Sequence, residues 1–493
     1  MARTATSRGV TARALLVAAV VASALAGLPA VAPAAEVSVG IRDNLFTPQQ
    51  LRIDPGDTVT WTNGGTRVHD VTSDTGEFLS GDLGRGASFS HRFEEEGYFY
   101  YHCSFHGRAG RQGMWGVVIV GDPPPPHGGD GDEHERPKIE VPGDFETIQA
   151  AVDAAEPGST IVVAPGTYPG GVRIATDDLV LKGVDRFRTV LDGGDTRPNG
   201  VVVAGARAVT VANLTVRDFT NDGILFQDAR RYTVDRVDAV GNGGHGVYSL
   251  RSYDGVVRRS YGWGSGAAAF AIAECMGCGA LFEDVYASMS YVGYSGTNAT
   301  GVTVRDSKWV RNGAGIVTST DPSGNLGPGR GTLVVGNVVR DNDYANAPAF
   351  PATMGVPLGT GVWLAGVQNN VVRDNEVTGH DRFGVLVSES GAEPVGNTVR
   401  RNRLDGAAEH VLAWDGTGSD NCFEDNSFTG ETGPPEIETL YACARRPFDG
   451  TPYAPVQDAV AAGIAESEAR VPEEPRDPSR PRCQKGRPGC HRH

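Results

Sequence analysis

Two patterns of hydrophobic and polar positions divide the chain, one before residues 122–138 and one after them. Across residues 36–121, apolar residues alternate with polar ones in short runs, as at Val37, Val39 and Ile41. Pro-Gly and Asn-Gly pairs separate these runs. Alternation with a period of two marks half-buried β-strands, and such pairs mark tight turns. The first region is therefore predicted to be a small antiparallel β-sandwich.

In the second region, residues 139–447, short strands that open on glycine recur at a fixed spacing. The step is 23 residues along Gly200, Gly223, Gly246, Ala269, Val292 and Gly315. Gly361 lies 46 residues further, which we interpret as two periods, and Gly384 follows 23 residues later. In the first two periods, apolar residues recur at matching offsets and indicate a second and a third strand per coil. A repeat of this length without a helical unit predicts a parallel β-helix of about a dozen coils.

An amphipathic helix is expected at the entry to this β-helix, over residues 145–156. Ile148, Ala151, Val152 and Ala155 fall on one helical face, and Pro157-Gly158 ends the pattern. Asp144 is placed to cap the first turn. Because the end of a β-helix exposes unpaired strand edges, we expect this helix to cover the first coil.

Segments outside the two folded regions are predicted from composition. Residues 1–34 join three arginines to an apolar run and then to small residues, the layout of a secretory signal peptide. The apolar run is shorter than a bilayer requires, so a membrane anchor is the less favoured interpretation. Residues 122–138 combine prolines, glycines and charges and predict a linker. Residues 448–493 are rich in Arg, Pro and Glu and predict a disordered tail. We expect a secreted or periplasmic protein without a transmembrane segment in its mature form.

The balance of charge narrows the classes of partner. The chain has 60 acidic and 44 basic residues among 493, and a formal net charge of −16. A negative surface repels phosphate backbones, so we expect no nucleic-acid partner. The 67 glycines show no Gly-X-Y period, which favours a turn-rich β protein over a collagen-like or helical one.

Four candidate metal ligands occur together in the first region. The run Tyr-His-Cys-Ser-Phe-His places Cys103 and His106 on one tight loop, and Met114 opens the last strand. His69 lies upstream, after a Trp-x-Asn motif. Two imidazoles, one thiolate and a thioether suit a copper ion that cycles between Cu(I) and Cu(II). A structural zinc site is the competing interpretation, but zinc usually takes four strong ligands, often with several cysteines.

The pattern W-x-N…H followed by Y-x-C-x-x-H…M resembles cupredoxins of the plastocyanin, amicyanin and pseudoazurin type, over the whole of the first region. The resemblance implies a Greek-key β-sandwich with one type 1 copper ion. It implies His69, Cys103 and His106 as equatorial ligands and Met114 as the axial ligand. Seven residues separate His106 from Met114, more than the compact loop of the family holds, and Gln112 is the alternative axial ligand.

Two neighbours of these ligands are candidates to support them. Asp70 follows the first histidine and Ser104 follows the cysteine. We predict that they hydrogen-bond across the two loops and hold the thiolate in place, as outer partners of metal ligands commonly do.

Cysteine usage agrees with an exported copper protein. The chain has 7 cysteines, and an odd count in an exported chain leaves one that needs another role. A copper thiolate at Cys103 supplies that role. The other six are expected to form the pairs Cys275–Cys278, Cys422–Cys443 and Cys483–Cys490, although spacing does not fix connectivity. Cys275 and Cys278 could instead form a redox or copper-handling pair, but no thioredoxin-like βαβ pattern surrounds them.

The entry of the second region also carries a resemblance. The residues TIQAAVDAAEPGSTIVVAPGTY, followed by LVLKG, resemble the opening of secreted right-handed, pectin-lyase-like β-helix proteins. That group includes pectin methylesterases, alginate epimerase-like proteins and the β-helix protein that helps to mature nitrous-oxide reductase. The resemblance covers the entry coil and the repeat, and it implies a fold without specifying an activity.

Chemistry on the β-helix would need carboxylates and basic groups on one exposed face. Candidates are His245, Tyr248, Glu274, Asp306, His380, Asp381 and Arg382. The glycine register suggests that His245 and His380 lie along one edge. A sugar-stacking strip could be formed by Tyr253, Tyr261, Trp263, Tyr286, Tyr291 and Tyr294, although core packing explains aromatic residues equally well. Because no epimerase or esterase motif is recognised, solvated turns are the favoured explanation of the charged residues.

The sequence therefore predicts an all-β secreted protein with a blue-copper domain tethered to a right-handed parallel β-helix. One-electron transfer to an unidentified redox protein is the favoured function, ahead of hydrolase or lyase activity. By resemblance to the cupredoxins, the edge of His106 is the expected route for the electron. Two alternatives stay open, namely a polysaccharide lyase, epimerase or hydrolase acting through the β-helix, and a copper-handling accessory protein for a partner metalloenzyme.

Overall fold

The computed structural model describes residues 35–469 except for 44, 74–76, 95–96, 109–111, 122–135, 325 and 345–354. The predicted signal peptide, most of the predicted linker 122–138 and the cysteines Cys483 and Cys490 lie outside the described residues. Among the described residues, no helix combines the length and the apolar composition that a bilayer crossing needs.

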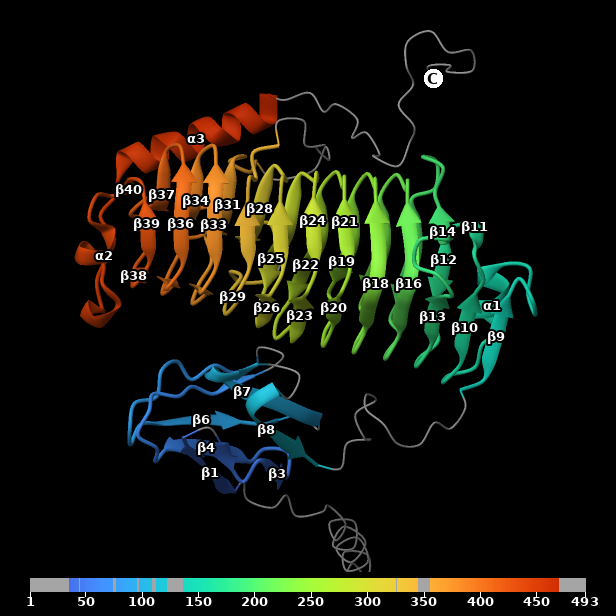
Figure 1. Ribbon diagram of the computed structural model, residues 1–493, viewed down its shortest axis with the longest axis horizontal. Coiled ribbons are helices and arrows are strands. Elements are labelled where there is room, and N and C mark those ends of the chain that lie inside the picture. Colours follow the sequence, from blue (N-terminus) through green and yellow to red (C-terminus); the bar gives the residue numbers. More distant parts are fainter. Residues whose placement is uncertain are drawn as a thin grey trace, which may run out of the picture.

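The first region is a β-sandwich of two four-stranded sheets (Figure 1). One sheet has the order β2 (Leu45–Thr47), β1 (Glu36–Arg42), β4 (Thr58–Asn63), β6 (Ser88–Arg92), and the other β3 (Gln50–Ile53), β8 (Gln112–Val120), β7 (Gly97–Arg108), β5 (Thr72–Ser73). Trp61 and Tyr101 are fully buried between the sheets. The pairs β1–β4 and β3–β8 are parallel, so the expected purely antiparallel sandwich is a mixed one. In each of these pairs, other strands separate the two partners along the chain. The long connection between the partners permits parallel pairing.

The second region is a parallel β-helix, so the predicted all-β fold class is confirmed (Figure 1). One face is an 11-stranded parallel sheet. Its strands are β12 (Val172–Ile174), β15 (Asn199–Ala204), β17 (Asp222–Gln227), β19 (His245–Leu250), β22 (Ala268–Cys275), β25 (Val292–Ala299), β28 (Ala314–Ser319), β31 (Thr360–Ala365), β34 (Phe383–Ser388), β37 (His410–Trp414) and β40 (Thr432–Gly433).

Two further series of strands complete each coil. The first is β9 (Lys138–Val141), β10 (Thr160–Val163), β13 (Val180–Gly183), β16 (Thr210–Arg217), β18 (Thr233–Val240), β20 (Val256–Arg258), β23 (Ala280–Glu283), β26 (Val302–Arg305), β29 (Leu333–Val335), β32 (Val371–Arg373), β35 (Thr398–Arg400) and β38 (Cys422–Glu424). The second is β11 (Gly166–Pro169), β14 (Thr189–Asp192), β21 (Tyr261–Trp263), β24 (Tyr286–Ser288), β27 (Lys308–Val310), β30 (Val338–Arg340), β33 (Glu376–His380), β36 (Arg403–Ala407) and β39 (Ser427–Thr429). The long strands β16 and β18 run through both series.

The 23-residue register holds for the early coils and then departs from the sequence prediction. Phe270 pairs with Tyr294, so Gly293 rather than Val292 takes the repeating glycine position. The 46 residues from Gly315 to Gly361 span one coil, because β28 pairs directly with β31. The two-period interpretation is therefore wrong, since loops inserted at coil corners lengthen one turn without adding another.

Helices cover both ends of the β-helix. At the entry, α1 (Ile148–Ala154) buries Ile148, Ala151 and Val152, as predicted. Its N-cap is Thr147, whose Oγ1 accepts from the Ala150 N–H at 3.2 Å. Asp144 is not the cap and instead accepts from the Glu140 N–H.

The predicted disordered tail, residues 448–493, is ordered in part. After α2 (Ile437–Leu440) and the short 3₁₀ turn Cys443–Arg445, α3 (Ala454–Ala469) lies along the last strands of the 11-stranded sheet (Figure 1). Val456 and Val460, one helical turn apart, pack into a cluster with Trp363 and Leu386. This apolar face orders residues 454–469, and the prediction of disorder is wrong there.

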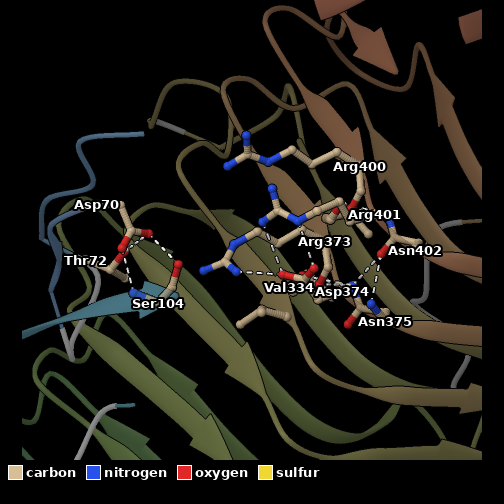
Figure 2. A network of polar contacts seen from close by, with 12 residues as sticks. Asp70, Thr72, Ser104, Val334, Arg373, Asp374, Asn375, Arg400, Arg401 and Asn402 are labelled. Carbon is tan, nitrogen blue, oxygen red and sulfur yellow. Dashed lines mark hydrogen bonds and ion pairs between the residues drawn. The ribbon is translucent and has the colours of Figure 1, made fainter. Parts of the chain in front are cut away.

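Stacked asparagines fasten one corner of successive coils. The Nδ2 of Asn337 donates to the Oδ1 of Asn375, that of Asn375 to Asn402, and that of Asn402 to Asn426, at 2.9–3.0 Å. Asn375 and Asn402 are visible as part of this row in Figure 2. The same Nδ2 groups also satisfy backbone carbonyls, as Asn375 does at Val334. Each asparagine thus provides hydrogen-bond partners for polar groups that would otherwise be buried without one.

Replacing Asn375 by Ala is predicted to lower the free energy of unfolding by about 2–4 kcal/mol, because several buried donors and acceptors lose their partner. The measurement is thermal or urea unfolding followed by circular dichroism. Thr429→Ala, at an exposed position of β39, is the control and should stay within about 0.5 kcal/mol of the parent. Equal effects of the two substitutions would contradict a structural role for the row.

Candidate metal centre

Three of the predicted ligands converge at one end of the sandwich. Strand β7 pairs with β8 as far as His102, and the register then shifts before pairing resumes at Gly107. The irregular stretch between carries Cys103 and His106. The Sγ of Cys103 lies 3.5 Å from the Nδ1 of His69 and 3.4 Å from the Nδ1 of His106. One donor atom from each of the three residues lies within 4.8 Å of the other two.

His69 is held by backbone and side-chain contacts on both sides. Its N–H and C=O both pair with Leu83. While Nδ1 faces the sulfur, Nε2 lies 3.5 Å from the Oδ1 of Asp43. Hydrogen bonds from the side chain and backbone of Thr66 hold the pKa of Asp43 well below its ordinary value, so this carboxyl is ionised. A carboxylate behind one ring nitrogen favours the tautomer that leaves the other nitrogen free to bind a metal.

Asn63 fixes the loop that leads to His69. It is fully buried, and its Nδ2 donates to the carbonyls of Arg67 and Leu83 while its Oδ1 accepts from the Gly65 N–H. Sequence reasoning used Asn63 only as part of a motif and missed Asp43. The signal for Asn63 was the W-x-N pattern, whereas nothing in the local sequence pointed to Asp43.

The predicted contact between Asp70 and Ser104 is present. The Oδ1 of Asp70 accepts from the Ser104 N–H at 2.6 Å, and its Oδ2 accepts from the Ser104 hydroxyl at 2.5 Å and from Thr72 at 3.1 Å (Figure 2). One carboxylate therefore joins the residue after His69 to the residue after Cys103. The two ligand-bearing loops cannot separate without breaking the bonds between Asp70 and Ser104.

The surroundings favour neutral groups when no metal is bound. Burial, with a further contribution from the negative charge of Asp70, raises the pKa of the Cys103 thiol to about 11. Burial and the nearby charges of His69 and Arg67 lower the pKa of His106. A cation that binds a thiolate and two neutral imidazoles must therefore displace the thiol proton. This donor set suits copper, because the sulfur favours Cu(I) and the nitrogens serve both oxidation states.

The structure describes the side chain of one of the two candidate axial ligands, Met114. Met114, on β8, is buried and belongs to the same apolar cluster as Cys103. The side chain of Gln112 lies outside the described part of the structure.

Cysteine pairing agrees with the prediction where it is described. Cys275–Cys278 and Cys422–Cys443 are disulfides, and Cys103 is the free cysteine among the described residues. Cys275 and Cys278 are fully buried in the β-helix core, which makes them poorly accessible to a redox partner.

The candidate residues of the β-helix fall into separate places. His245, Tyr248, Glu274 and Tyr291 line one groove of about 320 Å³ on the 11-stranded sheet. Asp306 lies at a second cleft, between the sandwich and the β-helix. The structure places Asp381 beside Gly359 at the β31 turn, and Arg382 forms ion pairs with Glu409 and with Glu466 of α3.

His380 does not share an edge with His245, contrary to expectation. In the strand register, Phe383 occupies the position of His245, and His380 ends a strand on another face. His380 is 2% exposed and accepts from the Asn342 N–H at 3.2 Å, which makes it a part of the asparagine rows.

The predicted aromatic strip does not form as a single surface. Tyr294 is fully buried against Phe282 and Trp309, whereas Tyr261 and Tyr286 pair with each other on a different face. Tyr253 packs under the Arg230 guanidinium. Core and surface positions alternate along each strand and so divide the cluster that looked continuous in sequence.

Comparison with known proteins separates the same two regions. Residues 34–121 match the family of copper binding proteins, plastocyanin/azurin family, and residues 199–433 match the right handed beta helix region. Halocyanin from Natronomonas pharaonis is 41% identical over 80 residues, which are 15% of this chain and 47% of halocyanin. The chain thus spans about half the length of that curated relative.

Two similar solved structures each cover a part of the chain. The mannuronan C-5 epimerase AlgE6 A-module of Azotobacter vinelandii is 20% identical, covers 58% of this chain and 82% of its own, and has a TM-score of 0.47. A purple cupredoxin from Nitrosopumilus maritimus is 34% identical, covers 17% of this chain and 99% of its own, and has a TM-score of 0.15.

The raised pKa of Cys103 predicts slow alkylation of the metal-free protein. With a pKa of about 11, roughly one thiol in a thousand is ionised at pH 8. The rate of reaction with iodoacetamide should rise about tenfold per pH unit from pH 7 to 10, without a plateau. The measurement uses mass spectrometry on a background in which Cys483 and Cys490 are serine.

Asp70→Asn provides the matched comparison for this measurement. It removes the negative charge that adds to the pKa shift while keeping an oxygen that accepts from Ser104. Alkylation at pH 8 should therefore be severalfold faster than in the parent. A plateau near pH 9 in the parent would contradict the raised pKa.

Proposed function

Because this chain carries a copper-binding cupredoxin domain followed by a right-handed β-helix region, we propose that it is an exported one-electron carrier with a single type 1 copper ion. The observation that supports this most directly is the meeting of the Cys103 Sγ with the Nδ1 atoms of His69 and His106. In this proposal those three atoms would hold the ion, and the thioether of Met114 would be its fourth and weakest ligand. The copper ion, when bound, supplies reversible exchange of one electron between Cu(I) and Cu(II).

The residues around the ligands orient them, link their loops and exclude water. Asp43 orients the His69 ring from behind, and Asp70 ties the two ligand loops through Ser104. His69 and Cys103 are fully buried, so water is kept from the sulfur. A site whose donors are held before and after electron exchange reorganises little, which favours fast transfer. His106, only partly buried, is the route by which the electron leaves in this proposal.

Titration with Cu(II) tests the ligand set. We expect one copper ion per chain and an intense thiolate-to-copper absorption in the visible spectrum. Cys103→Ser should abolish this absorption, because serine offers no soft sulfur. Met114→Leu should retain it with a shifted maximum, since the axial thioether is a weak ligand. If both variants absorb as the parent does, the assignment is wrong.

A second candidate function rests on the groove of the 11-stranded sheet. The groove is lined by the small residues Ala268 and Ala271 and by Tyr248 and His245. The Nδ1 of His245 lies 2.8 Å from the Oδ1 of Asp222, which orients the ring, and the His245 and Tyr248 rings stack at 4.2 Å. Burial raises the pKa of Tyr248 to about 12, so its hydroxyl stays protonated and can donate. A flat aromatic face beside polar donors suits a polysaccharide chain.

His245→Ala and Tyr248→Phe test this second function in the full chain. Binding to a panel of neutral and acidic polysaccharides is measured by affinity electrophoresis, and both substitutions should weaken binding of any ligand about tenfold or more. Lys308→Ala, exposed on another face, serves as the control. Absence of binding by the parent across the panel would count against a polysaccharide ligand.

A further inference from the structure

The sandwich and the β-helix touch through oppositely charged groups. The carboxylate of Asp82, in the sandwich, pairs with the Arg400 guanidinium of the β-helix at 3.1 and 3.4 Å. The guanidinium carbon of Arg401 lies 5.6 Å from the centre of the Phe105 ring. Figure 1 shows the sandwich beside the coils that contain β26 and β29, whose residues line a cleft with it. Because Phe105 lies between Cys103 and His106, the contact joins residues 103–107, which we call the copper-ligand loop, to the β-helix.

On the β-helix side of this contact, ion pairs within the β-helix hold the guanidinium groups. Asp374 pairs with Arg373 at 2.7 Å and with Arg401 at 3.0 Å, which sets the directions of both guanidinium groups (Figure 2). Arg373 is 5% exposed. Arg373 and Arg400 end β32 and β35, Asp374 and Arg401 follow them, and Asn375 and Asn402 fasten the corners that come next. We call the set Arg373, Asp374, Arg400 and Arg401 the arginine wall.

The arginine wall faces the immediate neighbours of the proposed copper ligands. A cleft of about 320 Å³ remains between the two regions, lined on the sandwich side by Ser104, Phe105 and Gly107 among others. Ser104 and Gly107 adjoin Cys103 and His106 in the chain. A protein partner that approaches this edge of the loop therefore meets the β-helix first, whereas a small molecule can enter the cleft.

Charge and tethering both favour the docked arrangement. The sandwich presents Asp82 and Asp70, and both act electrostatically on the guanidinium of Arg401. A single exposed ion pair is weak in isolation. Because one chain carries both surfaces, the effective concentration of one for the other is in the millimolar range, and weak contacts suffice to populate the docked state.

We propose that the arginine wall is the docking surface for the copper-ligand loop of the same chain, and that docking closes this edge of the copper centre to protein-sized redox partners. Exchange with a protein at this edge then requires undocking, while molecules that fit the cleft reach the loop without it. The redox part of this inference rests on the proposed function, but the docking itself does not.

Charge reversal across the contact tests docking in the full, metal-free chain. Arg400→Glu and Asp82→Arg should each lower the ratio of docked to undocked molecules about tenfold, and the double variant, which restores opposite charges, should recover most of that ratio. Small-angle X-ray scattering measures the change as a larger radius of gyration in the single variants. Arg403→Glu, an exposed charge reversal whose described ion pair is with Glu376 of the β-helix, is the matched control and should leave scattering unchanged.

The copper-loaded chain tests the consequence. Electron self-exchange between Cu(I) and Cu(II) copies needs no other partner and has no driving force, and nuclear magnetic resonance line broadening measures its rate. The single variants should exchange several times faster than the parent, and the double variant should return toward it. Reduction by ascorbate, which is small enough for the cleft, should change less than twofold.

The outcomes separate the inference from the proposed function. Scattering and self-exchange that are unchanged in both single variants would overturn docking. If the double variant does not recover the ratio of docked to undocked molecules, the Asp82–Arg400 pair does not determine docking. A protein that binds no copper but still expands on charge reversal would overturn the proposed function and leave the docking surface standing.

Discussion

The carboxylate of Asp70 is the interaction on which the geometry of the metal centre depends. It bridges two loops that are 34 residues apart by accepting from both the N–H and the hydroxyl of Ser104. Without this carboxylate, the pairing of β5 with β7 would be the nearest link between the loops that carry His69 and Cys103. A buried carboxylate is stable only when its oxygens are satisfied, and Thr72 together with Ser104 meets that requirement. Burial raises the pKa of the Cys103 thiol and the charge of Asp70 adds to that rise, so the carboxylate that organises the site also disfavours a thiolate without a metal.

In the β-helix, a repeated turn with an asparagine fixes the corners of successive coils. In the later coils, corners turn through a residue with positive φ, such as Asp374 or Arg401, and the next residue is an asparagine that hydrogen-bonds to the following coil. The row passes hydrogen bonds from coil to coil and ends on Glu438 of α2. Side chains that project from such corners keep fixed spacing over several coils, which is what a docking surface or a groove requires.

Much of the fold and of the site was predictable because the signals are local or periodic. Cys103 and His106 share one short loop, the glycine repeat revealed the β-helix, and the amphipathic pattern of residues 145–156 revealed its entry helix. The 46-residue step was misjudged because periodicity counts residues, whereas a coil with inserted loops uses more residues for the same turn. Residues 454–469 looked like a tail from their composition, but Val456 and Val460 find an apolar partner only in the folded sheet.

Contacts that depend on the tertiary arrangement left no sequence signal. Asp43 reaches His69 from another strand connection, and Asp82 meets Arg400 across 318 residues. No motif relates such pairs, because each depends on the folding of two separate units and on how these units meet. His245 and Asp222 are an intermediate case, since they lie one 23-residue period apart and the register brings them together once the coil is known. In the β-helix, the repeat thus indicates which residues become neighbours. The contacts between the sandwich and the β-helix can be seen only in the assembled structure.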